Sequence, residues 1–412
     1  MGIICYDWQK KMPEFGKTCF TANPRKIKAL MLKLYKLYRN ELFIFAISFS
    51  LFGAFLYLRI PTDIQAHVRK TQDVINGSTP PGADFFYYLI IYAVALFSTK
   101  KVLLGISSVV LLSLAITAKF EITKRFMASQ IGIGNTSSGL FILLFSNLLL
   151  LAFSLPTSSI LKGQFYLGQT PPNVWHNSTT ILLMPFALVL FWLSYEQIIK
   201  PEKRRIFLIS IFCVLNVLIK PSFYFVFTIV YPLMLIMYIG VKKELWLNLL
   251  PLIIGAISLV GEYYLIYRVE GPYSGTSSVA ISPFLVWSYY SPNILLSIVA
   301  STFFPLVYIF FNWKEVFRNA LLGYAALSYL VSILIYSTLT EIGTRQYHAN
   351  FSWQCIVCNY ILFTVVSARF IQKACSNGKI NWQNKLILTS FLLHVIFGCL
   401  YLIRFFVTKE YA

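Results

Sequence analysis

Long apolar stretches recur along almost the whole chain, and they constrain its fold more than any other feature. Each is about 15 to 22 residues long, close to what an α-helix needs to cross the roughly 30 Å hydrocarbon core of a bilayer. Hydrophobic residues make up 58% of the 412 residues and charged residues only 12%, too few for the surface of a soluble globular domain. The sequence therefore predicts an all-α, polytopic transmembrane protein.

Twelve of these stretches are candidate spans, and they divide the chain into three parts. A basic arm, residues 1–40, comes first, and within it 27–38 repeats apolar residues and Lys at helical spacing, which is typical of an amphipathic helix on the cytoplasmic membrane surface. A single transmembrane helical domain, 41–406, and a short C-terminal tail, 407–412, follow. Because the arm has no signal-peptide cleavage pattern, we expect the first span to act as an uncleaved signal anchor. The candidate spans are 41–60, 84–98, 102–118, 138–155, 179–198, 206–219, 222–240, 245–267, 293–311, 320–338, 353–371 and 386–406.

The basic residues predict the orientation. The formal net charge is +20, but Lys and Arg punctuate the apolar segments instead of gathering on one soluble domain, so no nucleic-acid partner is expected. The positive-inside rule places Lys/Arg-rich connections in the cytoplasm, where they attract anionic lipid headgroups. Successive basic clusters are separated by two spans, so all of them fit that side. They are 202–205, 242–243, 314–318 and 373–385. We expect a multi-pass protein of the plasma (inner) membrane with a cytoplasmic N-terminus.

One candidate span must fail to cross if all the outer connections are to share a side. Segment 84–98 is the weakest candidate, and we expect it to be a re-entrant or interfacial helix, which leaves about eleven crossings. The alternative is an unrecognised crossing near 119–137, against which its polar sequence argues. The outer connections are then 61–83, 156–178, the break at Lys220 and Pro221, 268–292 and 339–352.

Three of the four histidines, His67, His176 and His348, lie in these outer connections beside other polar residues. Asp63 precedes His67 by four residues, a spacing that puts both side chains on one face of a helix. The carboxylate would then orient the imidazole, or both groups would contact one substrate. The alternative is a solvated helix end. Asp63 and His67 are the candidate catalytic residues, whereas His394, within the last span, is expected to form interhelical hydrogen bonds.

The second outer connection and Lys220 supply candidate substrate-binding groups. A Pro-Pro pair in this connection is followed by a set of four residues that offer hydrogen-bond donors and acceptors for a sugar hydroxyl or a phosphate. They are Asn173, Trp175, His176 and Asn177. Trp175 alone would also suit an interfacial anchor. Lys220, beside the helix-breaking Pro221, would either pair with a phosphate or snorkel to the interface.

The last outer connection adds four further candidate substrate-binding residues, which are Glu341, Arg345, His348 and Asn350. Arg345 suits a phosphate because a guanidinium donates two parallel hydrogen bonds. The alternative is an internal ion pair with Glu341 that closes the loop.

Metal and redox sites receive less support from the sequence. Asp63 and His67, with the other outer histidines, are metal-ligand types, but no metal-binding motif is present, so a divalent cation stays an alternative and no cofactor is required. Cys355 and Cys358 have C-x-x-C spacing at the start of a predicted span, where packing is the expected role.

The chain resembles the GT-C superfamily of polytopic glycosyltransferases, in particular bacterial members linked to surface-polysaccharide assembly. The resemblance covers most of the chain and rests on the basic N-terminus, the dozen apolar segments, Asp63 with His67, and the stretches 171–179 and 341–353. It implies a GT-C-like fold with non-cytoplasmic loop helices, a lipid-phosphate sugar donor, and Asp63 as general base or metal partner. It also implies that Lys220 and Arg345 neutralise the donor phosphate. The chain has no Asp-x-Asp or Asp-Glu pair in the first outer loop, which puts metal dependence in doubt.

These observations lead to one hypothesis and three alternatives. The hypothesis is a membrane glycosyltransferase that transfers a sugar from a polyprenyl-phosphate donor to a glycan or lipid-linked acceptor on the non-cytoplasmic face. Such an enzyme needs fixed cations for the leaving phosphate and a base for the acceptor hydroxyl. A polysaccharide polymerase would use the same chemistry, and an acyltransferase would hold its His in a helical core. A transporter or flippase of lipid-linked glycans predicts mid-membrane charges and inverted repeats, neither of which the sequence displays.

Overall fold

The computed structural model describes residues 24–80, 82, 84–132, 136–157, 168–267, 277–377 and 381–410. The chain forms two compact units, Met1–Ile44 and Phe45–Ala412. In the first unit the described backbone is the beginning of helix α2 (Pro24–Tyr57). Because α2 continues through residue 40, the predicted boundary there is not a helix end. Residues 1–23 of the predicted basic arm, and the side chains on which the amphipathic pattern of 27–38 depends, lie outside the described part.

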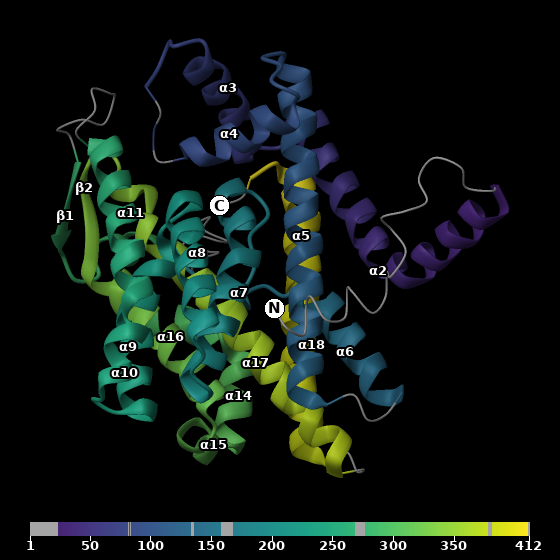
Figure 1. The fold of residues 1–412 in the computed structure, drawn as a ribbon, viewed down its shortest axis with the longest axis vertical. Helices are drawn as coiled ribbons and strands as arrows, with labels where there is room; N and C mark the ends of the chain where they lie inside the picture. The colour runs from purple at the N-terminus through teal and green to yellow at the C-terminus, as the bar shows by residue number, and fades with distance from the viewer. Residues whose placement is uncertain are drawn as a thin grey trace. The chain divides into compact units, whose positions relative to one another are not determined.

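The second unit is built from helices and one small sheet (Figure 1). In the sheet β1 (Ser277–Ile281) runs antiparallel to β2 (Leu339–Gly343). The helices are α3 (Asp63–Ile75), α4 (Phe85–Val94), α5 (Lys101–Ile131), α6 (Thr136–Leu149), α7 (Ser178–Ile199), α8 (Lys203–Ile219), α9 (Ser222–Ile239), α10 (Lys243–Asn248), α11 (Leu250–Tyr267), α12 (Leu285–Tyr290), α13 (Ile294–Ser301), α14 (Phe303–Phe311), α15 (Trp313–Arg318), α16 (Ala320–Thr338), η2 (Gln346–His348), η3 (Asn350–Ser352), α17 (Trp353–Asn377) and α18 (Trp382–Thr408).

The described helices confirm an all-α, polytopic membrane protein. Eight helical segments are long and apolar enough to cross a membrane, and α13 with α14 adds a ninth if this pair, bent by 77°, counts as one broken span. The predicted total of about eleven crossings also includes α6 and α8, which have 14 and 17 residues. That total stays a prediction.

The lengths of helices α4 and α5 bear on which segments in the N-terminal part of the domain can cross the membrane. The ten residues of α4 extend only roughly 15 Å, about half of a hydrocarbon core, which fits a segment that does not cross. Helix α5 has 31 residues and ends where Gly132 adopts a φ of +75°, a conformation that glycine tolerates best. The alternative of a separate crossing near 119–137 is therefore wrong, because residues up to Ile131 belong to one long helix.

The polar connections gather at two opposite ends of the second unit. Helices α3 and α4 lie at the upper end in Figure 1, and α10 and α15 lie at the lower end. Helix α7 begins beside α3, where Asp63 N–H donates to the His176 carbonyl, and it finishes at the lower end, where Gln197 binds Asn248. Helix α8 returns to the upper end at Lys220. Three of the predicted outer connections therefore meet at one end of the domain through their described residues, at Asp63, His176 and Lys220.

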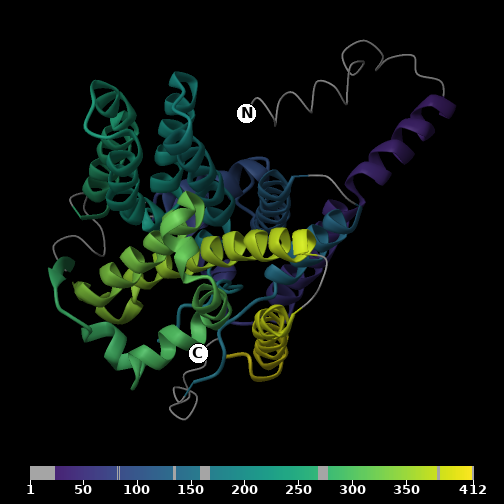
Figure 2. The ribbon, with the colours of Figure 1, turned by 90° about the horizontal axis from the view of Figure 1, so that it is seen from below.

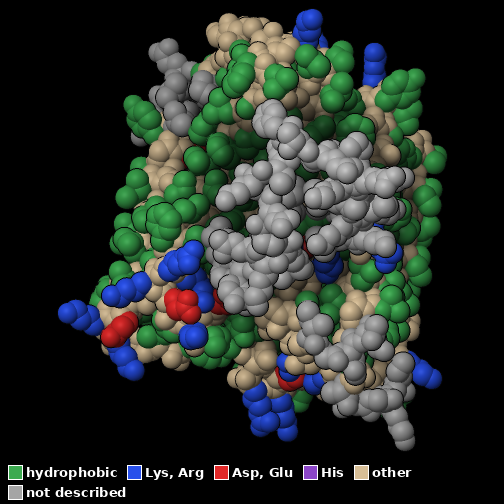
Figure 3. Space-filling view, turned by 45° about the vertical axis from the view of Figure 1, so that its right-hand side comes forward, with side chains coloured by type: hydrophobic (Ala, Val, Ile, Leu, Met, Phe, Trp, Pro, Cys, Tyr) green, Lys and Arg blue, Asp and Glu red, His purple; other side chains and the backbone are tan. Residues whose placement is uncertain are grey.

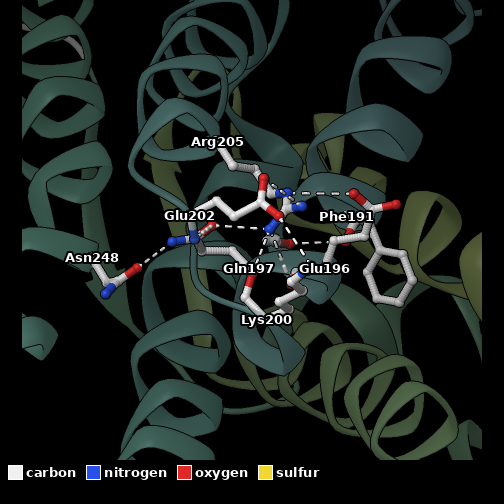
Figure 4. Close-up of polar contacts among 8 residues, drawn as sticks. Phe191, Glu196, Gln197, Lys200, Glu202, Arg205 and Asn248 are labelled. Carbon is white, nitrogen blue, oxygen red and sulfur yellow. Dashed lines mark hydrogen bonds and ion pairs between the residues drawn. The ribbon is translucent and has the colours of Figure 1, made fainter. Parts of the chain in front are cut away.

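A polar network closes the lower end of the α7–α8 pair (Figure 4). The Arg205 guanidinium forms ion pairs with Glu196 (3.4 Å) and Glu202 (3.3 Å). Gln197 accepts a hydrogen bond from the Glu202 N–H and donates to Asn248 Oδ1 at 2.6 Å. Because several charge-assisted bonds share one half-buried guanidinium, this network fixes the α7–α8 turn and the start of the next hairpin together.

Helix α17 lies in the middle of the domain (Figure 2) and packs against α5, α6, α7, α9, α14 and α16. Its Cys355 and Cys358 are buried thiols, and Cys355 contacts the Ser332 carbonyl, so their role is packing.

In α18, His394 accepts from the Phe304 N–H at 3.2 Å and its other ring nitrogen contacts the Phe153 carbonyl, which confirms the predicted interhelical bonding. Hydrophobic side chains cover much of the described surface toward the left and right edges of Figure 3, as expected where lipid surrounds a protein.

Candidate functional site

Four separate segments meet in one cluster of polar side chains at the upper end. Asn177 Nδ2 donates to Asp63 Oδ2 at 2.7 Å, and Lys220 Nζ donates to Asn177 Oδ1 at 2.9 Å and to Thr179 Oγ1 at 3.3 Å. The Lys220 ammonium also lies 4.2 Å from the centre of the Trp353 ring. We call Asp63, His67, Asn177, Lys220 and Trp353 the site cluster. Its members come from α3, the start of α7, the α8–α9 break and the start of α17.

The local sequence explains why Asn177 and Lys220 face each other. Asn177 is the N-cap of α7, and its Oδ1 accepts from the Thr180 N–H at 2.9 Å, a role for which Asn is among the preferred residues. Pro221 forces the preceding residue out of the helical conformation, and Lys220 has φ −173° and ψ 117°. The resulting break lets the Lys220 side chain leave the helix and reach the α7 cap.

Asp63 is held from both its main chain and its side chain. Its N–H donates to the His176 carbonyl at 2.9 Å, and its carboxylate accepts from Asn177. Burial raises the pKa of Asp63, while the charges of His67 and Lys220 act in the opposite direction. A carboxylate with a raised pKa and a fixed orientation is a suitable general base.

His67 lies one turn further along α3, on the same face, as the spacing predicts. Its ring packs against Tyr87 and Tyr88, with centroids 4.9 and 5.6 Å away. No hydrogen bond joins it to Asp63, and its Nδ1 has no hydrogen-bond partner among the described residues. The expectation that Asp63 orients this imidazole is therefore wrong, since Asn177 takes that position. Burial lowers the pKa of His67, so the ring is neutral and able to accept a proton at neutral pH.

Lys220 is the cation of the cluster. Burial lowers its pKa to about 8, against the opposing influence of Asp84 and Asp63, and nearby Arg345 lowers it further. No carboxylate lies within ion-pair distance of Lys220 among the described residues. Two of its three ammonium hydrogens serve Asn177 and Thr179, and the third remains available for an anion. His176, whose pKa burial lowers to about 3, lies beside the same Trp353 ring as a neutral group.

Two acidic residues near the cluster are absent from the sequence-based prediction. Asp84, just before α4, lies close enough to Asp63, His67 and Lys220 for their charges to interact. Glu262, in α11, is 4% exposed and interacts with Asp84 in the same way. Each is a lone acid beside or within an apolar run, which is itself a recognisable sign of a functional position.

Two predicted substrate-binding residues instead hold the second outer connection in place. Asn173 accepts a hydrogen bond from the Lys119 ammonium and donates to the carbonyls of Leu149 and Ala152, both at 2.7 Å. Trp175 is 4% exposed and packs against Phe153 and Tyr401, whose rings also stack on each other. Its interpretation as an interfacial anchor is therefore wrong, since the ring belongs to the aromatic core.

Lys119 also corrects the expectation that the span interiors are nearly free of charge. It lies within α5, is 2% exposed, and its ammonium is 3.6 Å from the centre of the Tyr360 ring. Because the predicted span stops at residue 118, this lysine is assigned to a loop by the sequence. The longer α5 places it inside a candidate membrane helix.

The last outer connection forms its own network. Arg345 Nε lies 3.2 Å from Glu341 Oε1, and Asn350 Nδ2 donates to Glu341 Oε2 at 2.5 Å. The alternative of an internal ion pair is thus what the structure contains, although Arg345 also lies near enough to Lys220 to affect it. His348 is exposed on η2, and no contact joins its side chain to the site cluster. Only two of the three outer histidines therefore lie at the cluster.

The described residues contain no group of three or more His, Cys, Asp or Glu side chains spaced to hold a metal ion. Asp63 and His67 are the predicted ligands, and they do not form a metal-binding set with other described side chains. The chemistry visible in the cluster is that of a base, a cation and an aromatic surface. No protein-family profile, curated protein or solved structure matches the chain.

Proposed function

We propose that this protein is a GT-C-type membrane glycosyltransferase that transfers a sugar from a polyprenyl-phosphate donor to a glycan or lipid-linked acceptor. The observation that carries the proposal is the chain of contacts from Asp63 through Asn177 to Lys220 and Trp353. It joins a base to a cation at the end of several apolar helices. The proposal includes about eleven crossings, a cytoplasmic N-terminus, and a site on the non-cytoplasmic face of the inner membrane.

The residues suit the bond changes of glycosyl transfer. The acceptor hydroxyl attacks C1 of the donor sugar, the bond from C1 to the phosphate oxygen breaks, and the polyprenyl phosphate leaves. Lys220 is mostly protonated at neutral pH, because its pKa is about 8, so it stabilises the leaving phosphate. Asp63 takes the proton of the acceptor hydroxyl, and His67 is the second candidate base.

The position of Lys220 fits a lipid-linked donor. It lies at the break between two apolar helices, next to the first turn of α17. A phosphate bound there leaves a polyprenyl tail within the hydrocarbon layer, while the sugar reaches the polar connections above. Trp353 suits this boundary because its ring is apolar and its N–H is a donor.

The test is transfer by the purified protein in lipid vesicles. A panel of undecaprenyl-phosphate sugars serves as donors, and the products are separated by mass. Asp63→Asn and Lys220→Met should each abolish most transfer. Asp73→Asn and Lys200→Met are the matched controls, because Asp73 is exposed on the same helix α3 and the Lys200 side chain is 81% exposed at the lower end. Equal activity of Asp63→Asn and wild-type protein would contradict the assignment.

A transporter of lipid-linked glycans is the second candidate, and one observation favours it. Lys119 is a buried cation inside a candidate span, and such residues are common in transport pathways. The two functions give different products in the same vesicles. A transporter changes the leaflet in which a labelled lipid-linked glycan is found and forms no new glycosidic bond. A transferase forms the bond.

A further inference from the structure

None of the contacts described for the site cluster involves the buried carboxyl group of Glu262. It lies in the last two turns of α11, is 4% exposed, and its Oε2 has no hydrogen-bond partner among the described residues. A buried carboxylate is strongly disfavoured unless donors or a cation satisfy it. An acid retained in such a position therefore indicates a missing donor.

The helices around Glu262 bring it to the site cluster. Helix α11 packs along α8, which ends at Lys220, and α4 also contacts α8. Asp84, which precedes α4, lies close enough to Glu262 and Lys220 for their charges to interact. No ion pair joins Glu262 to Lys220 among the described residues.

We propose that Glu262 binds hydroxyl groups of the transferred sugar, while Lys220 and Trp353 hold the phosphate of the same donor. This inference rests on the proposed function and names the part of the donor that each residue recognises. The carboxyl oxygens of Glu262 accept hydrogen bonds, and neighbouring sugar hydroxyls supply the donors that Oε2 lacks. A metal ion is a poorer occupant, because Glu262 belongs to no set of described side chains that could hold one.

The test compares two lipids that differ only in the sugar. Binding of undecaprenyl phosphate and of undecaprenyl-phosphate sugars is measured on the full-length protein in nanodiscs. Glu262→Gln should weaken binding of the preferred sugar-bearing lipid roughly 2- to 10-fold, the range expected for one lost hydrogen bond between neutral groups, and leave undecaprenyl phosphate unaffected. Lys220→Met should weaken both lipids. Glu244→Gln, an exposed acid at the start of the same hairpin, is the control and should change neither.

The outcomes separate the inference from the proposed function. If the wild-type protein binds neither lipid, the proposed function fails and this inference fails with it. If the wild-type protein binds the sugar-bearing lipid more tightly and Glu262→Gln keeps that preference, only the inference is wrong. Glu262→Asp guards against misfolding, since it keeps the acid and should retain part of the preference. A large loss of thermal stability in both variants, with unchanged lipid preference, would make Glu262 a structural residue.

Discussion

Replacing Lys220 tests the central electrostatic argument. Lys220→Met removes the ammonium and keeps a side chain of similar length. The ammonium has one hydrogen left after its bonds to Asn177 and Thr179, so one charge-assisted hydrogen bond to a phosphate is lost. Such a bond contributes about 1.5 to 3 kcal/mol, which corresponds to a roughly 10- to 150-fold weaker binding of undecaprenyl phosphate.

The pH dependence of the same binding gives a second, independent measure. Burial lowers the pKa of Lys220 to about 8, so the cation disappears as the pH rises through 8. Phosphate-lipid affinity should therefore fall between pH 8 and 10, by up to about tenfold per pH unit. Lys220→Arg keeps its charge in this range, so its affinity should stay flat. A wild-type affinity that is constant from pH 7 to 10 would refute the reasoning.

The change in folding stability with pH that Lys220 causes has an expected sign as well. The folded protein binds a proton at Lys220 more weakly than the unfolded chain, whose lysine has the ordinary pKa of 10.5. Between pH 8 and 10.5 the unfolded state binds more protons, so this group makes the folded state more stable as the pH rises. Lys220→Met should abolish that dependence without lowering the unfolding temperature at pH 7, as measured by thermal unfolding in detergent.

Three further predictions concern the base and the second outer connection. Asp63→Asn should lower the turnover number about 10²- to 10⁴-fold, with an unfolding temperature like that of Asp73→Asn; a loss below fivefold would exclude Asp63 as the base. Asn173→Ala removes the acceptor of the buried Lys119 and the donor of two carbonyls, so unfolding should cost about 3 kcal/mol less, and adding Lys119→Met should restore part of this loss. Trp175→Ala removes a buried ring that packs against Phe153 and Tyr401 and should destabilise the protein by about 3 to 5 kcal/mol, whereas Trp175→Phe should have a small effect.

The convergence of distant segments could be predicted from the sequence because it depends on sidedness alone. Basic clusters between pairs of spans assign the remaining connections to the other side. Asp63, Asn177 and Lys220 follow from that assignment, and they do meet. The sequence does not show which residue of one loop contacts which residue of another. The i, i+4 spacing predicts His67 as the partner of Asp63, but the partner is Asn177, because the α7 cap fixes an amide where the imidazole cannot reach.

The residues that the prediction missed are single charges in apolar surroundings. Lys119 and Glu262 lie within stretches whose hydropathy average hides one ionisable side chain. Which face of a helix such a residue occupies is set by the neighbouring helices, and the apolar pattern of a membrane helix is similar on every face. Asp84 is missed for a related reason, since it becomes visible only when α4 is known to pack beside α8.

The second outer connection shows why the site geometry is fixed before a substrate arrives. Buried backbone groups need protein partners, and those of Thr170 have them, because its N–H donates to Ser301 and its carbonyl accepts from Asn359. Its hydroxyl also bonds with Tyr329. Asn173 secures the middle of the segment. The segment continues directly into the α7 cap, so the bonds of Thr170 and Asn173 also fix the position of Asn177. Mutations of Thr170 or Asn173 should therefore change turnover by altering the distance between Asp63 and Lys220, although neither residue is among the described contacts of those two.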